Sequence, residues 1–148
     1  MKARFIALAT LVIGIAGCDD VIGIGNRDFE GFYSFAGTVD HEIGDAVVGT
    51  FSITRQRGGR ADVVIDWSYL DNGQEIIVIT TDSPAVADLD SDGDIFFEFE
   101  GELFIDGAWY AFRLTHDGRL RRGVMTGGWE LSTGLPTTDS GTFTAQRH

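Results

Sequence analysis

The alternation of apolar and acidic residues within residues 95–105 constrains the fold of this chain more than any other feature. The apolar residues that share one face are Ile95, Phe97, Phe99, Leu103 and Ile105. Glu98, Glu100 and Glu102 point to the opposite face. Because successive side chains of a β-strand alternate between the two faces of a sheet, this pattern predicts a strand with one buried and one solvated face.

The same period of two recurs along the chain, and no segment shows the period of an amphipathic helix. We predict strands at residues 30–40, 46–55, 61–70, 75–81, 95–105, 108–116, 120–131 and 141–147. The tight turns predicted between neighbouring strands are Asn72-Gly73, Asp106-Gly107 and Asp117-Gly118. These dipeptides favour the left-handed backbone that a short hairpin needs.

Residues 29–148 are therefore expected to form a single all-β domain, long enough to bury one core. Eight sequential antiparallel strands with short connections favour an up-and-down (meander) barrel, because closure removes exposed strand edges. Gly37, Gly49 and Gly101 interrupt apolar faces, where small residues permit the bending that a barrel requires. A β-sandwich is the alternative architecture.

The number of strands and the aromatic-rich first strand, with Gly31-Phe32-Tyr33, resemble the lipocalin-like, or calycin, barrels. Those barrels usually begin with Gly-X-Trp, and Tyr33 stands here at the place of the tryptophan. An eight-stranded barrel is just wide enough either to be filled by side chains or to hold one small apolar ligand. The residues predicted to line such a ligand site are Phe35, Phe51, Trp67, Phe97 and Phe99. A filled core built from the same residues is the alternative.

The first seventeen residues have the parts of a secretory signal: Lys2 and Arg4, an apolar run over residues 5–13, and small residues before a cleavage point. The four residues that end this segment are Ile15, Ala16, Gly17 and Cys18. They resemble the lipobox of bacterial lipoproteins, which implies cleavage before Cys18 and attachment of lipid to its sulfur. An ordinary secretory or single-span anchor segment is the alternative.

Lipid attachment is consistent with Cys18 being the only cysteine, since no disulfide can form within the chain. Two or more acyl chains anchor a protein stably to a membrane. Residues 18–28 are expected to be a flexible tether between the anchor and the domain. Asp19 resembles the signal that retains enterobacterial lipoproteins in the inner membrane. The resemblance thus implies a cell-envelope location facing the periplasm or the exterior, with the inner membrane favoured.

Charge limits the partners of the domain. The chain has a net charge of −12, and cleavage before Cys18 would remove Lys2 and Arg4 but no acidic residue. A strongly acidic domain is repelled by nucleic-acid phosphates and by anionic lipid headgroups. We therefore expect no nucleic-acid binding, membrane association only through the lipid anchor, and a monomer that meets an envelope protein as its partner.

An aspartate-rich segment matches the first half of a calcium-binding loop. Its carboxylates are those of Asp88, Asp90, Asp92 and Asp94. Alternating carboxylates followed by a glycine, here Gly93, can converge on Ca²⁺, which takes six to eight oxygen ligands. The twelfth position of such loops is normally glutamate, and it is Phe99 in this chain. An acidic connection between strands without a bound ion is the alternative.

No catalytic motif accompanies these features. The sequence contains neither Gly-x-Ser-x-Gly nor His-Glu-x-x-His, and its three histidines are scattered. His41, His116 and His148 are expected to be solvated residues near turns or the terminus. We therefore expect a non-enzymatic, membrane-anchored envelope lipoprotein that acts as a scaffold or interaction domain. The alternative is a carrier of a small apolar ligand in the barrel interior.

Overall fold

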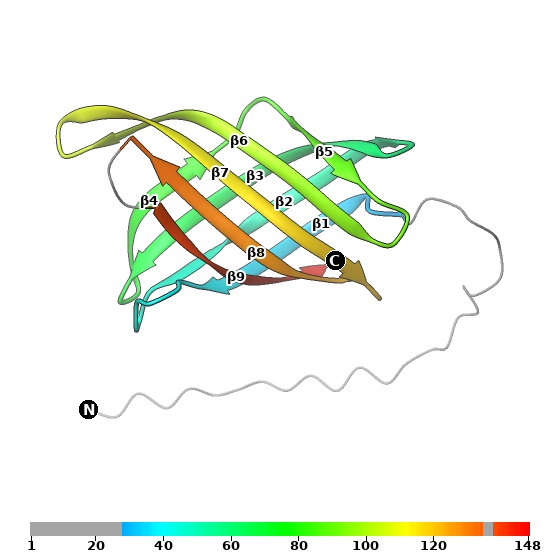
Figure 1. Cartoon of the computed structure of the whole chain (residues 1–148), viewed down its shortest axis with the longest axis horizontal. Helices are drawn as coiled ribbons and strands as arrows, with labels where there is room; N and C mark the ends of the chain where they lie inside the picture. Colours follow the sequence, from blue (N-terminus) through cyan, green and yellow to red (C-terminus); the bar gives the residue numbers. More distant parts are fainter. Residues whose placement is uncertain (1–27, 135–137) are drawn as a thin grey trace.

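Nine antiparallel strands make up the part of the chain that the computed structural model describes, residues 28–134 and 138–148 (Figure 1). The strands are β1 (Gly31–Thr38), β2 (Ala46–Arg57), β3 (Arg60–Asp71), β4 (Gln74–Thr80), β5 (Ala85–Leu89), β6 (Asp94–Ile105), β7 (Ala108–Arg121), β8 (Val124–Thr133) and β9 (Thr138–Arg147). These residues include no helix that could cross a membrane. The predicted signal segment, its lipobox and residues 18–27 of the tether lie outside the described residues.

Eight of the strands close into a barrel, as the sequence predicts, so the alternative of a sandwich is wrong. The ring runs β1, β2, β3, β5, β6, β7, β8, β9 and returns to β1. Closure takes place between the first and last strands, where Phe35 lies opposite Ala145. The odd-numbered residues of the first predicted strands face inward, and Tyr33, Val47 and Val63 are fully buried there.

The remaining strand, β4, results from an interruption that the sequence prediction did not include. Both β4 and β5 pair antiparallel with β3, β4 with residues 66–71 and β5 with residues 60–63. Residues 81–84 separate them and form the loop that projects from the barrel wall in Figure 1. The two short strands thus share one position in the barrel, and β5 lies between residues 81 and 95, where the sequence analysis placed no strand.

Two of the three predicted turns are confirmed. Asn72 and Gly73 have φ angles of 47° and 85°, and the turn at Asp106 has a similar left-handed backbone, with φ 50°. The third prediction is wrong, because β7 continues through Gly118 and turns at Arg122, which has φ 52°.

The physical reason for this third outcome is packing. A Cβ atom at Gly118 would lie 3.1 Å from both Met125 Cγ and Phe143 Cζ. Gly118 therefore allows Met125 and Phe143 to pack closely against β7, and it does not form a turn.

Aromatic side chains fill the middle of the barrel. Tyr33 stacks on Phe51 with ring centroids 4.9 Å apart, and Phe51 lies 5.5 Å from Phe97. Trp67 and Trp129 meet edge to face at 5.6 Å. Such pairs add to the free energy gained by burying their large apolar surfaces. The middle of the barrel is therefore a packed core.

Candidate ligand-binding seam

The barrel wall is incompletely paired between β4 and β6, and we call this region the seam. On the side of β6 away from β7, the described partner strand is β5, which pairs through Asp88 opposite Phe96 and Leu89 opposite Ile95. Beyond Phe96, no described strand pairs with β6 on this side, and β4 pairs only with β3. Two strand edges therefore border the seam without a partner strand among the described residues.

The backbone of β6 directs hydrogen-bonding groups toward the seam. The N–H of Asp90 donates to the carbonyl oxygen of Asp94 at 2.8 Å, from the β5 side of β6. Alternate residues of a strand direct their backbone groups to the same side. The N–H and C=O groups of Glu98, Glu100 and Glu102 consequently point toward the seam.

The same reasoning applies to β4 on the other side. The N–H of Thr81 donates to the carbonyl oxygen of Ile65 in β3 at 3.0 Å, and the Thr81 hydroxyl accepts from the Ile65 N–H. Since odd-numbered residues pair with β3 here, Val78 and Thr80 direct their backbone groups away from it. At the end of β4, the Thr81 hydroxyl thus takes the place of a backbone carbonyl as the acceptor for the Ile65 N–H.

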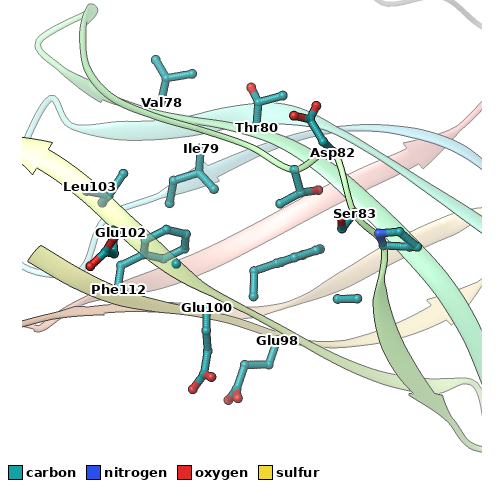
Figure 2. Close-up of a pocket in the computed structure, with 15 residues that line it drawn as sticks. Val78, Ile79, Thr80, Asp82, Ser83, Glu98, Glu100, Glu102, Leu103 and Phe112 are labelled. Atoms are coloured by element: carbon teal, nitrogen blue, oxygen red, sulfur yellow. The ribbon is translucent and has the colours of Figure 1, made fainter.

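A pocket of about 560 Å³ lies in the seam. Its apolar lining includes Ile79 from β4, Phe99 and Leu103 from β6, and Phe112 from β7. Figure 2 shows Ile79 and Phe112 extending toward each other, with Asp82 and Ser83 at one side. Volumes of a few hundred Å³ and apolar walls are typical of small-ligand sites.

Gly101 shapes this pocket. A Cβ atom there would lie 2.8 Å from Cε1 of Phe112, the residue opposite it in β7. The Phe112 ring thus occupies the space that a side chain at position 101 would need. A second hollow of about 570 Å³ also has Glu100, Gly101 and Phe112 in its lining.

The outer border of the seam is acidic. Glu98, Glu100 and Glu102 lie on the outer face of β6, and Figure 2 shows the first two extending away from the apolar lining. Arg113 in β7 lies 3.0 Å from Glu100 and 3.5 Å from Glu98, and these carboxylates raise the pKa of its guanidinium group. Within the described chain, no ion pair reaches Glu102. The border therefore keeps excess negative charge.

Large apolar side chains are exposed beside one end of the seam. Val78 on β4 is 50% exposed, while Phe104 and Trp109, at the tip of the β6–β7 hairpin, are 60% and 67% exposed. The two aromatic rings lie 5.2 Å apart. Val78 and Leu103 line the same pocket, which places Phe104 at the same end. Exposed apolar clusters with polar surroundings are typical of interaction sites.

The structure separates the residues predicted to line a ligand site. Phe99 lines the seam pocket, whereas Phe35, Phe51, Trp67 and Phe97 pack in the interior. The interruption at residues 81–84 moves the candidate site from the interior to the wall. Pro84, which has no N–H for a strand ladder, is the sequence signal that could have indicated this break.

His116 is buried, so the prediction of a solvated turn residue is wrong. Its ring stacks on Phe97 with centroids 4.9 Å apart and meets Phe143 at 5.3 Å and Phe35 at 5.9 Å. Neither ring nitrogen has a hydrogen-bond partner within the described residues. Burial lowers the pKa of His116 to about 3, which keeps it neutral.

The four aspartates of the predicted calcium loop do not converge. Asp88 lies in β5, 3.5 Å from Arg60, and Asp94 begins β6 and accepts from Arg119 Nη2 at 2.7 Å. The remaining two, Asp90 and Asp92, lie in the connection, where the Asp92 N–H donates to the Asp90 carboxylate. In the part of the chain that the structure describes, no group of three or more such side chains is placed to hold a metal ion.

Comparison with known proteins supports the fold alone. No family model matches the chain, and no curated protein matches it. Among solved structures, a redesigned β-barrel, mFAP1, bound to DFHBI, is similar with a TM-score of 0.50 and 14% sequence identity. The match covers 80% of this chain and 94% of that one. The chain is therefore similar in its barrel architecture to a designed protein.

Proposed function

We propose that this chain is a non-enzymatic envelope lipoprotein whose barrel is a binding domain, with the seam as its binding site. The observation that carries the proposal is the seam itself: two strand edges with no partner strand among the described residues border a pocket of about 560 Å³ whose lining includes Ile79, Phe99 and Phe112. Exposed strand edges normally carry an energetic and aggregation cost, and a partner that covers them removes it.

The membrane anchor in this proposal is inferred from the sequence. Lipid on the sulfur of Cys18, which the resemblance of residues 15–18 to a lipobox implies, would attach the chain to a membrane. The described chain includes Asp28, just before the predicted domain, and its carboxylate accepts from Arg147 Nη2 at 2.7 Å. This contact ties the start of the domain to β9, on the side of the ring away from β5 and β6. The seam would then be free to meet another envelope component.

Site-specific photocrosslinking in the native host tests the proposal. Benzoylphenylalanine would replace Phe104 beside the seam or, as the control, Thr144, an exposed residue of β9 on the opposite wall. We expect adducts from position 104 that position 144 does not give and that weaken when Glu102 is changed to Lys. The same adducts from both positions would contradict a binding site at the seam.

A second candidate function is binding of a small apolar ligand in the seam pocket. Its support is the apolar lining from Ile79, Phe99, Leu103 and Phe112, together with the similar designed barrel, which is bound to DFHBI. Tryptophan fluorescence titrated with a panel of fatty acids tests this candidate. Saturable quenching that is lost in Phe99→Ala would support it, and no quenching across the panel would exclude it.

A further inference from the structure

We propose that the occupant of the seam is an extended peptide segment of a partner protein, which adds a strand to the free edge of β6. Its alternate side chains would be apolar toward the pocket and basic toward solvent. This inference rests on the proposed function and names the class of partner for the same site.

The backbone supplies the first argument. Glu98, Glu100 and Glu102 direct N–H and C=O groups toward the seam, and no described strand pairs with them. An added antiparallel strand would exchange hydrogen bonds with all three residues. Small rounded ligands cannot satisfy such a row of groups, whereas an extended peptide can.

The pocket supplies the second argument. Strand side chains alternate, so every second residue of the added strand would point inward, over Ile79, Phe99 and Phe112. These three side chains are apolar and at least nine-tenths buried, so the lining beneath the added strand is apolar. Inward-pointing residues of the partner segment should accordingly be apolar.

Charge supplies the third argument. In an antiparallel pair, residues opposite each other have side chains on the same face, so the outward residues of the added strand would lie beside Glu98, Glu100 and Glu102. Arg113 offsets part of this charge. Basic outward residues would gain attraction, and acidic ones would be repelled. A second copy of this chain is disfavoured for the same reason, since its β6 edge carries the same glutamates and its net charge is −12.

The length of the free edge sets the length of the segment. From Glu98 to Phe104, no strand of the described chain pairs with β6 on the seam side. A strand rises about 3.3 Å per residue, so about seven residues would cover this edge. Val78 and Phe104, which are exposed beside the pocket, would lie next to the added strand.

The test uses the full chain and a capped peptide of alternating valine and lysine, with valine at both ends and three lysines. We expect saturable binding, measured by calorimetry, and slower amide hydrogen exchange at Glu98, Glu100 and Glu102. The peptide with glutamate in place of lysine should not bind. In Glu102→Lys, affinity for the lysine peptide should fall about tenfold. The control Glu42→Lys, on the exposed β1–β2 loop, should bind as the parent does.

Methylation of the peptide backbone separates strand pairing from simple insertion of side chains. Residues with outward side chains have amides that face β6, so N-methylation of the three lysines should reduce affinity by at least about tenfold. N-methylation of the valines, whose amides face away from β6 and toward β4, should leave the hydrogen bonds to β6 intact. Equal affinities of the lysine-methylated and unmodified peptides would overturn the inference.

The two proposals fail in different ways. Crosslinks specific to position 104, without binding of the lysine peptide, would overturn the strand inference and leave binding at the seam. Peptide binding together with identical crosslinks from positions 104 and 144 would support strand addition and contradict the proposed role in the envelope.

Discussion

The buried imidazole of His116 gives the most quantitative prediction, for the change His116→Leu. The ring lies among Phe97, Phe35 and Phe143, and its exposed fraction is 0%. Burial alone lowers its pKa from 6.5 to about 3. Leucine has a similar volume and no ionisable group, so the change removes this titration without leaving a large cavity.

The magnitude follows from proton linkage. Between pH 6.5 and about 3, the unfolded chain binds a proton at His116 that the folded chain does not. The free energy of unfolding therefore falls by about 1.4 kcal/mol for each pH unit below 6.5. At two units below 6.5, this loss is about 3 kcal/mol, whereas above pH 7 it vanishes. His116→Leu should lose this dependence and become more stable than the parent on acidification.

Urea unfolding followed by fluorescence across this pH range measures the effect as the stability difference between variant and parent. The difference should be constant above pH 7 and grow by about 3 kcal/mol at two units below the ordinary pKa. His41→Asn is the control, because His41 is exposed and asparagine tolerates its φ of 70°. Parallel curves for parent and His116→Leu down to the acidic limit would refute a neutral, buried imidazole.

Three further predictions concern the barrel, the anchor and the acidic loop. Gly49→Ala would place Cβ 2.0 Å from the carbonyl oxygen of Asp66, so thermal and urea unfolding should show a loss of about 2 kcal/mol or more, while Gly128→Ala, with its closest contact at 3.6 Å, should lose less. Cys18→Ala should abolish acylation, so the variant should lack the mass of the lipid and should not partition into the membrane fraction as the parent does. Unchanged partitioning and mass would refute lipid attachment. Melting temperatures in calcium and in chelator should agree, because Asp88 and Asp94 are paired with arginines; a higher value in calcium would contradict this.

Local sequence determined most strand faces because alternation is a property of neighbouring residues. Val63, Ile65 and Trp67 point inward as their spacing predicts, and all three are buried. The turn at Asn72-Gly73 is likewise local, since its two residues themselves adopt positive φ. Eight closely spaced antiparallel strands also left a barrel as the favoured way to remove exposed edges.

Contacts between distant residues decided the rest. Asp117-Gly118 has the composition of a turn, yet Met125 and Phe143 pack against Gly118 and keep it within β7. His116 looked like part of that turn and became buried for the same reason. A dipeptide cannot report which side chains arrive from other strands.

The seam shows this division most clearly. The sequence by itself determined that β6 has an apolar face and an acidic face, and that Pro84 is unfavourable in a continuous strand. Only the tertiary structure decided that β4 and β5 share one position along β3 and that the β6 edge beyond Phe96 has no partner strand among the described residues. Strand pairing joins residues far apart in the chain, so the pattern along one strand cannot specify which neighbour it has or where that pairing ends.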